Sequence, residues 1–456
     1  MGNNNEALKR QIGLWTGVLI ITADMIGTGI FMTTGNVLGI TGNALWVLVL
    51  WGVGGLVAFS GALCYAELAT IWPQAGGEYV YLKNTFGYLP AFLTGWVSLV
   101  VGFSAPAAAG ALLIVQYTGS FFGVAGYTGI ENMLSQGSVG HRGMSALLVL
   151  FLGLLHMTGV RRGAVVQNTL TVIKIGIVIA LIGAGVLAAD WSKYGRLAVE
   201  YSVFGSTVHP IADYGLALLM IMFAYTGWNA ATYVAGEMKD PGRTLPAILG
   251  RSVVLVTILY MMLNVVFLVS TGGSNLMGVD EVGAVAVKYL LGNKGAILFT
   301  PVIAIIVLSS VSAQMMVGPR VYYAMARDGM MFRFLGRVHR SRYTPVPAIL
   351  LQTALAVFYV FTGTAITLIV YMGLALSVFP LLSVAGLMKL RKTHPHLERP
   401  YRVPFYPLLP LVFIILTVFM MVAAVISWTG TSLFSILALA AGIRLYYIWR
   451  RFERSD

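Results

Sequence analysis

Residues 26–31 read Ile-Gly-Thr-Gly-Ile-Phe and residues 223–229 read Phe-Ala-Tyr-Thr-Gly-Trp-Asn. Both stretches contain a Thr-Gly pair and interrupt apolar segments that are long enough to cross a bilayer as a helix. Glycine costs about 1 kcal/mol relative to alanine inside a helix, and backbone groups freed within a membrane need partners or a water-filled cavity. A matched pair of glycine-interrupted spans is typical of the binding site of a secondary transporter. We therefore expect a binding site between residues 26–30 and 223–228.

The composition is that of a membrane protein. The chain is 58% hydrophobic and 10% charged, whereas roughly 25% of the residues of a soluble domain are charged. The apolar residues form continuous runs, unlike the short alternating segments of a membrane β-barrel. The runs lie near residues 13–33, 43–70, 86–117, 143–160, 165–188, 212–236, 250–271, 291–324, 346–363, 365–388, 407–427 and 431–448. We predict an all-α polytopic membrane protein with twelve transmembrane helices.

The basic residues indicate an orientation. If the N-terminus is cytoplasmic, most of the 29 lysines and arginines fall in loops on the cytoplasmic side. This asymmetry predicts a multi-pass protein of the cytoplasmic (inner) cell membrane with both termini in the cytoplasm. It also accounts for the net charge of +13 without a nucleic-acid partner.

The helix count divides the chain into two halves of five spans. Because five is odd, the second half enters the membrane from the opposite side, which predicts a 5+5 inverted repeat led in each half by its broken helix. The predicted segments are a cytoplasmic N-terminus (1–12), the first repeat (13–188), an extracellular loop (189–211), the second repeat (212–391), a cytoplasmic loop (392–406), helices 11 and 12 (407–448) and a cytoplasmic C-terminus (449–456).

Other functional classes lack support in the sequence. Cys64 is the only cysteine, so a disulfide within the chain and a cysteine-built metal site are excluded, and we expect no disulfide-linked subunit. The six histidines form no metal-spaced set, and no phosphate loop or nucleophile elbow is present. A channel would need a selectivity filter, which is not recognisable. We expect no enzyme activity, no cofactor and no metal, and the sequence leaves the oligomeric state open.

Several motifs together carry a family resemblance. They are Gly-Thr-Gly-Ile-Phe at 27–31, Gly-Gly-Glu-Tyr at 76–79, Gly-Trp-Asn at 227–229, Asp240-Pro241 and Arg-Asp-Gly at 327–329. The chain resembles the amino acid–polyamine–organocation superfamily of transporters, and its Gly-Trp-Asn pattern is most similar to bacterial relatives of the L-type and neutral amino acid exchangers. The resemblance implies the leucine-transporter-type fold, with helices 1 and 6 broken and two extra C-terminal helices. It also implies alternating access and sodium-independent transport.

The two breaks suit the two charged groups of an amino acid. A half-helix beginning near Gly29 presents free N–H groups to a carboxylate, and one ending near Phe223 to Tyr225 presents free carbonyl groups to an ammonium. The alternative is that the glycines only allow helices to pack closely. The predicted substrate-binding residues are Asp24, Ile26, Gly27, Thr28, Gly29, Ile30, Phe223, Ala224, Tyr225, Gly227 and Trp228.

Two aromatic residues receive roles from the resemblance. It implies that Phe223 is a gate over the bound substrate, where an aromatic side chain facing lipid or the core is the alternative. Trp228 lies further along the same segment, and we expect it to form a wall of the side-chain pocket. The bulk of this indole favours a modest substrate side chain.

Lys174 lies deep within the fifth span, and an ammonium buried in a membrane is a functional hypothesis by default. The resemblance implies that Lys174 substitutes for the sodium ion of sodium-coupled relatives, bridging the fifth helix to carbonyls near Gly27 and to the eighth helix. Ser309, Ser310 and Ser312 lie where those relatives place ion ligands. The sequence leaves open whether Lys174 is a fixed structural cation or carries a proton.

Asp24 precedes Gly27 by one helical turn, and the resemblance marks it as a departure, because neutral exchangers usually have no acidic residue there. Three interpretations remain open: a pair with Lys174, a contact with the ammonium or cationic side chain of a substrate, or a protonated group bonded to a neighbouring helix. The second interpretation argues against a purely neutral substrate, but the first expectation is still exchange of small neutral L-amino acids. The alternative is a proton-coupled transporter or exchanger of cationic amino acids or amines that uses Asp24, and a channel or membrane receptor is a more distant one.

Charged residues near helix ends form a second candidate group. Glu67, Glu237, Arg320, Arg327 and Asp328 are predicted to form a cytoplasmic charge network, either as an inner gate or as solvated loops.

Overall fold

The computed structural model describes residues 8–188, 211–272, 274–279, 281–363, 365–427 and 429–453. These residues form helices joined by loops, with an isolated parallel bridge between Ile12 and Met238. Nearly all of the predicted loop 189–211 lies outside the described residues, so its placement stays a prediction.

The first half of the chain begins with an interrupted helix and ends with a long continuous one. Its helices are α1 (Leu14–Met25), α2 (Gly29–Thr41), α3 (Ala44–Ile71), α4 (Glu78–Phe86), α5 (Tyr88–Val97), the π-helical turn η2 (Ser98–Phe103), α6 (Ser104–Val124), α7 (Thr128–Met133), α8 (Val139–Met157) and α9 (Val160–Ala188).

The second half repeats this order and is followed by two further helices. It contains α11 (Ile211–Tyr225), α12 (Ala230–Tyr233), η3 (Ala235–Glu237), α13 (Pro241–Thr271), η4 (Ser274–Leu276), α14 (Val282–Val317), α15 (Pro319–Arg327), η5 (Arg333–Gly336), α16 (Val346–Thr362) and α17 (Ala365–Thr393). The last two helices are α18 (Leu408–Ser427) and α19 (Thr429–Glu453).

The residues at helix ends account for several boundaries. Asn43 precedes α3, and its side-chain oxygen accepts hydrogen bonds from the N–H groups of Leu45 (2.8 Å) and Trp46 (3.3 Å). Proline stands in the first turn of α13 and α15, where its missing N–H has no intrahelical acceptor to lose. Local sequence therefore sets where these helices begin.

The helix lengths agree with the predicted number of spans. Within the described residues, nine helices are long and apolar enough to cross a membrane, and the bent pair α1 and α2 makes ten. The shorter apolar helices α11 and α16 stand at the sixth and ninth predicted spans. A kink at Gly292 divides α14 directly beside residue 291, where the eighth span is predicted to begin.

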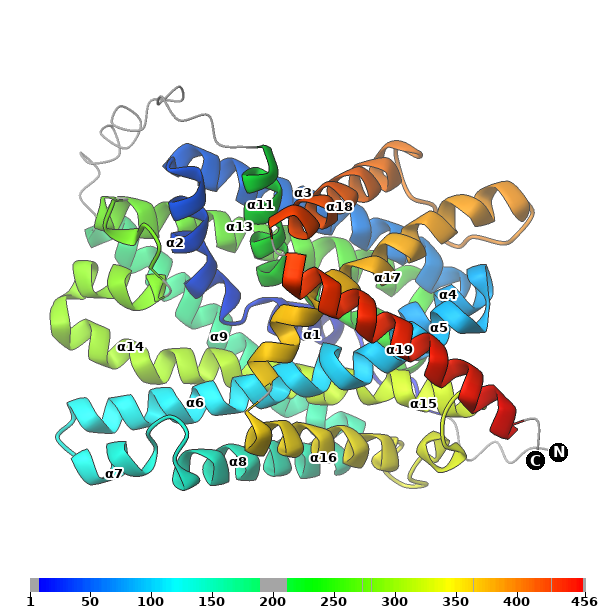
Figure 1. Ribbon diagram of the computed structural model, residues 1–456, viewed down its shortest axis with the longest axis horizontal. Helices are drawn as coiled ribbons and strands as arrows, with labels where there is room; N and C mark the ends of the chain where they lie inside the picture. The colour runs from blue at the N-terminus through cyan, green and yellow to red at the C-terminus, as the bar shows by residue number, and fades with distance from the viewer. Residues whose placement is uncertain are drawn as a thin grey trace.

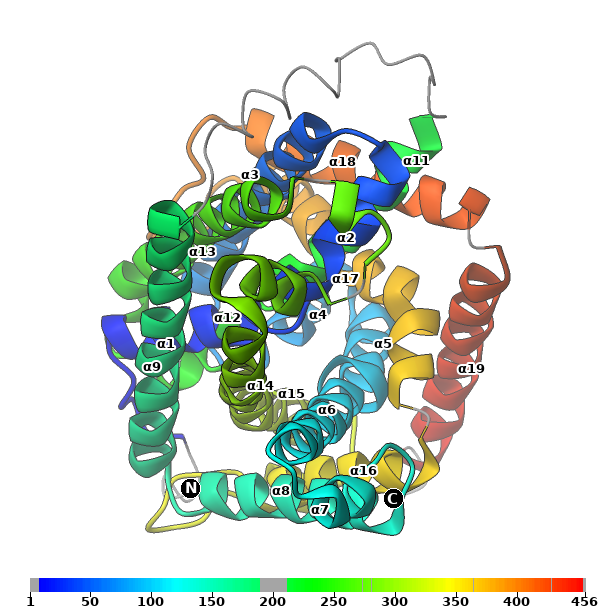
Figure 2. The same ribbon diagram turned by 90° about the vertical axis from the view of Figure 1, so that its left-hand side faces the viewer.

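The arrangement places α19 at the periphery and brings distant helices side by side. α8 and α16 lie along the lower edge of the molecule in both views, while α19 crosses the front in Figure 1 and lies along the right-hand edge in Figure 2. The segment before α1 pairs with the end of η3 and the residues that follow it. Gln11 N–H donates to Glu237 O at 2.8 Å, and Lys239 N–H donates to Ile12 O at 2.8 Å. This pairing fixes the entry of α1 beside the end of the second interrupted helix.

Candidate functional site

The first interrupted helix breaks between Met25 and Gly29, where α1 and α2 are bent by 44°. Ile26 leaves the helical conformation (φ −76°, ψ 89°), and the N–H of Gly27 donates to Met25 O at 2.9 Å. The first N–H groups of α2 therefore start inside the span, where no preceding turn supplies acceptors for them. Such a helix start favours an anionic group.

The second interrupted helix breaks after Tyr225, where α11 ends. Gly227 has φ +96°, a conformation that favours glycine, and a Cβ atom there would lie 2.7 Å from Oδ2 of Asp24. The Asp24 side chain of α1 thus packs against the backbone of the second break. A side chain at position 227 would be strained and would also displace Asp24.

The two breaks also touch at Gly29 and Ala224. A Cβ atom built on Gly29 would lie 2.6 Å from Cα and 2.7 Å from Cβ of Ala224. The start of α2 can approach the end of α11 this closely only because Gly29 has no side chain. The predicted residues of the two breaks are therefore brought together.

Lys174 on α9 reaches the first break and is fully buried. Its ammonium donates to the carbonyl oxygens of Ala23 (2.8 Å) and Ile26 (2.5 Å) and to Oγ of Ser310 (3.0 Å). These three acceptors match the three donors of an ammonium. One cation therefore joins α9, the unwound end of α1 and α14.

The Ser310 hydroxyl contacts the same two carbonyl oxygens as the Lys174 ammonium. The hydroxyl lies 2.9 Å from Ala23 O and 3.0 Å from Ile26 O. The carbonyls at the end of α1 thus face both a hydroxyl and an ammonium. Ser309 and Ser312 lie elsewhere: Ser309 O accepts from Gln167 (3.1 Å), and Ser312 Oγ lies 3.1 Å from Nε2 of His156.

Asp24 is half-buried and lies between the breaks. Its carboxylate interacts with the Gln314 side chain and, through charge, with the Lys174 ammonium. Among the described residues, Lys174 and Asp24 form no ion pair within 4.0 Å, because the ammonium is directed to Ala23, Ile26 and Ser310. The position of Asp24 leaves it able to contact a group bound at the breaks.

Tyr260 on α13 also lies at the two breaks, and the sequence did not single it out. Its hydroxyl lies 2.6 Å from Met25 O and 2.9 Å from Ala224 O, so one phenol bridges the carbonyl ends of α1 and α11. Asn264, one turn further, accepts a hydrogen bond from Thr34 of α2 at 2.6 Å. The sequence signal for this pair was the i, i+4 spacing of Tyr260 and Asn264, two polar residues within an apolar helix. This spacing places both on one face of the helix.

The remaining predicted residues differ in their surroundings. Ile26 and Ile30 are fully buried, and Thr28 is half-buried before the first turn of α2. Phe223 is 53% exposed on α11. Tyr225 is buried and donates to Trp51 O at 3.1 Å.

Trp228 packs away from the first break. Its ring meets the rings of Tyr65 at 4.7 Å and Phe413 at 5.9 Å, on α3 and α18. Its described ring contacts therefore lie outside the breaks, and its role as a pocket wall stays a prediction.

A buried carboxylate lies beyond the second break. Glu78, which begins α4, accepts hydrogen bonds from Tyr65 (2.9 Å), Asn229 (2.8 Å) and Thr94 (3.2 Å). Burial raises the pKa of this carboxyl group to about 7, and the hydrogen bonds oppose that rise. Because Asn229 follows Trp228, this acid links α4 to the second interrupted helix.

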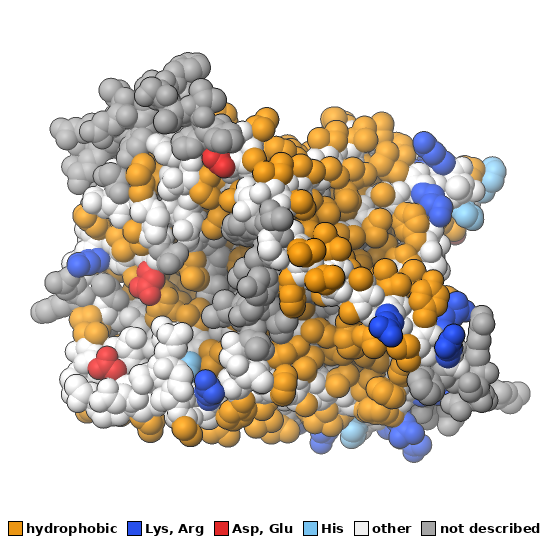
Figure 3. All heavy atoms as spheres, in the orientation of Figure 1, with side chains coloured by type: hydrophobic (Ala, Val, Ile, Leu, Met, Phe, Trp, Pro, Cys, Tyr) orange, Lys and Arg blue, Asp and Glu red, His pale blue; other side chains and the backbone are white. Residues whose placement is uncertain are grey.

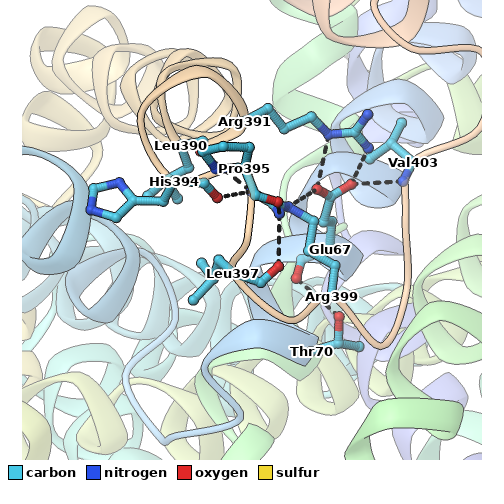
Figure 4. A network of polar contacts seen from close by, with 9 residues as sticks. All are labelled: Glu67, Thr70, Leu390, Arg391, His394, Pro395, Leu397, Arg399 and Val403. Carbon is cyan, nitrogen blue, oxygen red and sulfur yellow. Dashed lines mark hydrogen bonds and ion pairs between the residues drawn. The ribbon is translucent and has the colours of Figure 1, made fainter.

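The predicted charge network is divided among three buried or half-buried clusters. Glu67 accepts from Arg391, from Val403 N (2.7 Å) and lies 3.2 Å from Nε of Arg399, so it ties α3 to α17 and to the loop that follows (Figure 4). The alternative interpretation of these charges as solvated loops does not fit Glu67, because its side chain is fully buried.

The other two clusters lie at α15. Glu237 and Arg320, both buried, form two contacts at 2.6 Å and 3.0 Å. Asp328 pairs with Lys83 at 2.7 Å and accepts from Tyr79 at 2.9 Å. Each cluster joins segments that are distant in the sequence, and Lys83, Arg391 and Arg399 were not predicted as partners.

The described residues include no group of three or more His, Cys, Asp or Glu side chains placed to hold a metal ion. The candidate site brings together backbone groups at two helix breaks, the Lys174 ammonium, the Asp24 carboxylate and the Tyr260 hydroxyl.

Comparison with known proteins gives the family. The sequence profile described as amino acid permease matches residues 12–443. The chain belongs to the amino acid permease family. This membership agrees with the resemblance of its motifs to the amino acid–polyamine–organocation superfamily and confirms the predicted twelve-helix, inverted-repeat fold class.

Three relatives cover nearly all of this permease. The b(0,+)-type amino acid transporter 1 of Homo sapiens is 30% identical over 453 residues, 98% of this chain and 89% of that protein. The large neutral amino acids transporter small subunit 2 of Homo sapiens is 29% identical over 448 residues, 98% and 82% of the two chains. The serine/threonine exchanger SteT of Bacillus subtilis (strain 168) is 29% identical over 452 residues, 98% of each chain. The permease is a multi-pass membrane transporter of amino acids.

Proposed function

We propose that this permease exchanges small neutral L-amino acids by alternating access, with Lys174 in the place of a sodium ion. The observation that carries the proposal is the coordination of the Lys174 ammonium by Ala23 O, Ile26 O and Ser310 Oγ at 2.5–3.0 Å. Backbone carbonyls and a hydroxyl are also ligands that suit a small hard cation. A fixed ammonium that uses these oxygens removes the need for sodium.

The broken helices supply complementary groups for the substrate. The N–H groups at the start of α2 would bind the carboxylate, and the carbonyls at the end of α11 would bind the ammonium. Ala224 O already accepts from Tyr260 at 2.9 Å, but a carbonyl oxygen has two lone pairs. Gly29 lets the substrate approach the backbone directly.

Phe223 is proposed as the gate and Trp228 as part of the side-chain pocket. The half-exposed Phe223 side chain lies one residue before Ala224 on α11, so it can fold over a substrate held at the second break. The names of the relatives, which include a serine/threonine exchanger and a large neutral amino acids transporter subunit, support a neutral substrate.

The alternative substrate is a cationic amino acid or amine, carried by exchange or with protons. The half-buried Asp24 supports this alternative, because its carboxylate packs on Gly227 without a direct ion pair to Lys174 among the described residues. A cationic substrate side chain placed at the break could form the direct ion pair with the Asp24 carboxylate that Lys174 does not form.

The proposed location is the inner cell membrane with both termini in the cytoplasm. The segment before α1 and the end of α19 lie at the same end of the molecule (Figure 1). On the visible face, lysine and arginine side chains gather at that end, while hydrophobic side chains cover the middle (Figure 3). The proposed repeat boundaries remain 13–188 and 212–391. We also propose that no subunit is attached by a disulfide, since Cys64 is buried.

The proposal is tested by radiolabelled uptake into proteoliposomes containing the wild type or Asp24→Asn. Alanine, leucine and arginine are compared with and without internal amino acid, sodium or a pH gradient. We expect saturable, stereoselective alanine or leucine uptake that needs internal substrate, ignores sodium and survives Asp24→Asn. Arginine uptake that is lost in a folded Asp24→Asn variant would establish the alternative. Strict sodium dependence would contradict the role of Lys174, and binding without flux would indicate a receptor.

A further inference from the structure

A polar pocket lies at the end of α15, away from the two breaks. Its volume is about 460 Å³, and it is formed by the end of α15, the following turn and η5. The described residues that line it include three arginines, Arg327, Arg333 and Arg337, and one acid, Asp328. All three arginines are exposed.

Among the described lining residues, the arginines outnumber the acids. Asp328 is already held by the Lys83 ammonium at 2.7 Å and the Tyr79 hydroxyl at 2.9 Å, so its charge is compensated from α4. Within the described part of the chain, the side chains of Arg333 and Arg337 make no hydrogen bond or ion pair. Guanidinium groups are suited to bind phosphate through paired N–H donors. The pocket therefore favours a phosphate-bearing anion.

Exposed aromatic side chains adjoin this pocket. Phe332 and Phe334 are 57% and 50% exposed and stack at 6.0 Å with an interplanar angle of 27°. Phe332 also meets the ring of Trp449 on α19 edge-on at 5.0 Å. The Trp449 indole donates to the carbonyl of Gly329, a pocket residue, at 2.9 Å.

These aromatics indicate where the membrane surface lies. α19 is an apolar span with exposed Tyr447 and Ile448 next to Trp449, and indole rings are enriched at membrane–water interfaces. Arginine and lysine side chains gather at this end of the visible face (Figure 3). A water-soluble phosphate would leave the exposed Phe332–Phe334 stack without a function, whereas a lipid uses both the arginines and the rings.

We propose that this pocket binds the phosphate headgroup of an anionic phospholipid, while Phe332 and Phe334 enter the boundary between headgroups and acyl chains. The lipid would then join α15 to α19.

Native mass spectrometry of the full-length protein in detergent tests this proposal with phosphatidylglycerol and phosphatidylcholine of identical acyl chains. The test variant is the double substitution Arg333→Gln and Arg337→Gln. The matched control is Arg340→Gln, an exposed arginine of the same loop that does not line the pocket. Each arginine near a membrane surface contributes about 1 kcal/mol to anionic lipid binding. We therefore expect about thirtyfold weaker phosphatidylglycerol binding in the double variant, and wild-type binding in the control.

A further variant, Phe334→Ala, separates a lipid from a soluble phosphate. We expect it to weaken phosphatidylglycerol binding and to leave binding of glycerol 1-phosphate unchanged. Wild-type phosphatidylglycerol binding by the double arginine variant would overturn the proposal. Unchanged phosphatidylglycerol binding by Phe334→Ala, with glycerol 1-phosphate binding that requires Arg333 and Arg337, would overturn the lipid assignment and establish a soluble anion site.

Discussion

The ammonium nitrogen of Lys174 lies 2.8 Å from the carbonyl oxygen of Ala23, in the last turn of α1. The two residues are 151 positions apart in the sequence, and Ser310 of α14 meets both of them. Three helices are thus joined at the point where the first interrupted helix loses its regular hydrogen bonds. The ammonium supplies two hydrogen bonds to carbonyl groups that the single Ser310 hydroxyl cannot both satisfy.

Replacing Lys174 by methionine tests this arrangement, since methionine keeps much of the side-chain length and removes the charge. A buried polar group left without its partner costs about 1–3 kcal/mol, so we expect amino acid exchange to fall by about tenfold or more. The measurement is exchange in proteoliposomes, normalised to the amount of folded protein. Lys288→Met is the control, because Lys288 is exposed. Wild-type exchange by Lys174→Met would rule out a role for the ammonium.

Gly29→Ala tests the contact between the two breaks. The added Cβ would meet the backbone of Ala224 at 2.6 Å, and backbone cannot move aside as a flexible side chain can. We expect a loss of about 1–3 kcal/mol in stability from overpacking, seen as a lower thermal unfolding temperature, together with loss of exchange. Gly176→Ala in α9 is the matched control, because a Cβ there meets nothing within 4 Å. Equal behaviour of the two variants would refute the close approach.

Arg320→Gln tests the buried ion pair at α15. Removing one partner of a buried pair leaves an uncompensated charge on Glu237 and costs about 3–5 kcal/mol. We expect a clear fall in thermal stability, partly restored in the double variant Glu237→Gln with Arg320→Gln, which has no buried charge. A double-mutant cycle of unfolding free energies measures the coupling. Additive effects of the two substitutions would mean that the residues do not interact.

Glu78 predicts a pH dependence of stability. Burial raises its pKa from 4.5 to about 7, so the folded protein binds a proton there more tightly than the unfolded chain. The stabilisation is complete below about pH 4.5 and is lost as the pH rises through about 7, in total about 3 kcal/mol.

The measurement for Glu78 is the thermal unfolding temperature between pH 5 and pH 8 for the wild type and Glu78→Gln. Glutamine keeps the acceptor oxygen for Tyr65 or Asn229 and cannot ionise. We expect the wild type to lose stability toward pH 8 and the variant to lose less over the same range. Parallel curves for the two proteins would exclude Glu78 as the titrating group.

The sequence was sufficient to predict the fold class. The spans can be recognised as apolar runs, and the glycines at 27, 29 and 227 mark where two of these runs are interrupted. The kink of α14 at Gly292 lies beside the predicted start of the eighth span and is also marked by a glycine. Lys174 could also be singled out, because a charged side chain in the middle of an apolar span is costly to bury and usually has a function.

The sequence alone determined which segments cross the membrane and where two of them are interrupted, because burial in lipid and helix breaking depend on local composition. Only the tertiary structure decided which groups meet: Tyr260 with the carbonyls of Met25 and Ala224, Asp24 with Gly227, and the Lys174 ammonium with Ile26 rather than in an ion pair with Asp24. Such contacts depend on the rotation and depth of helices far apart in the chain. No local pattern encodes these quantities, because they are set when all the helices pack together.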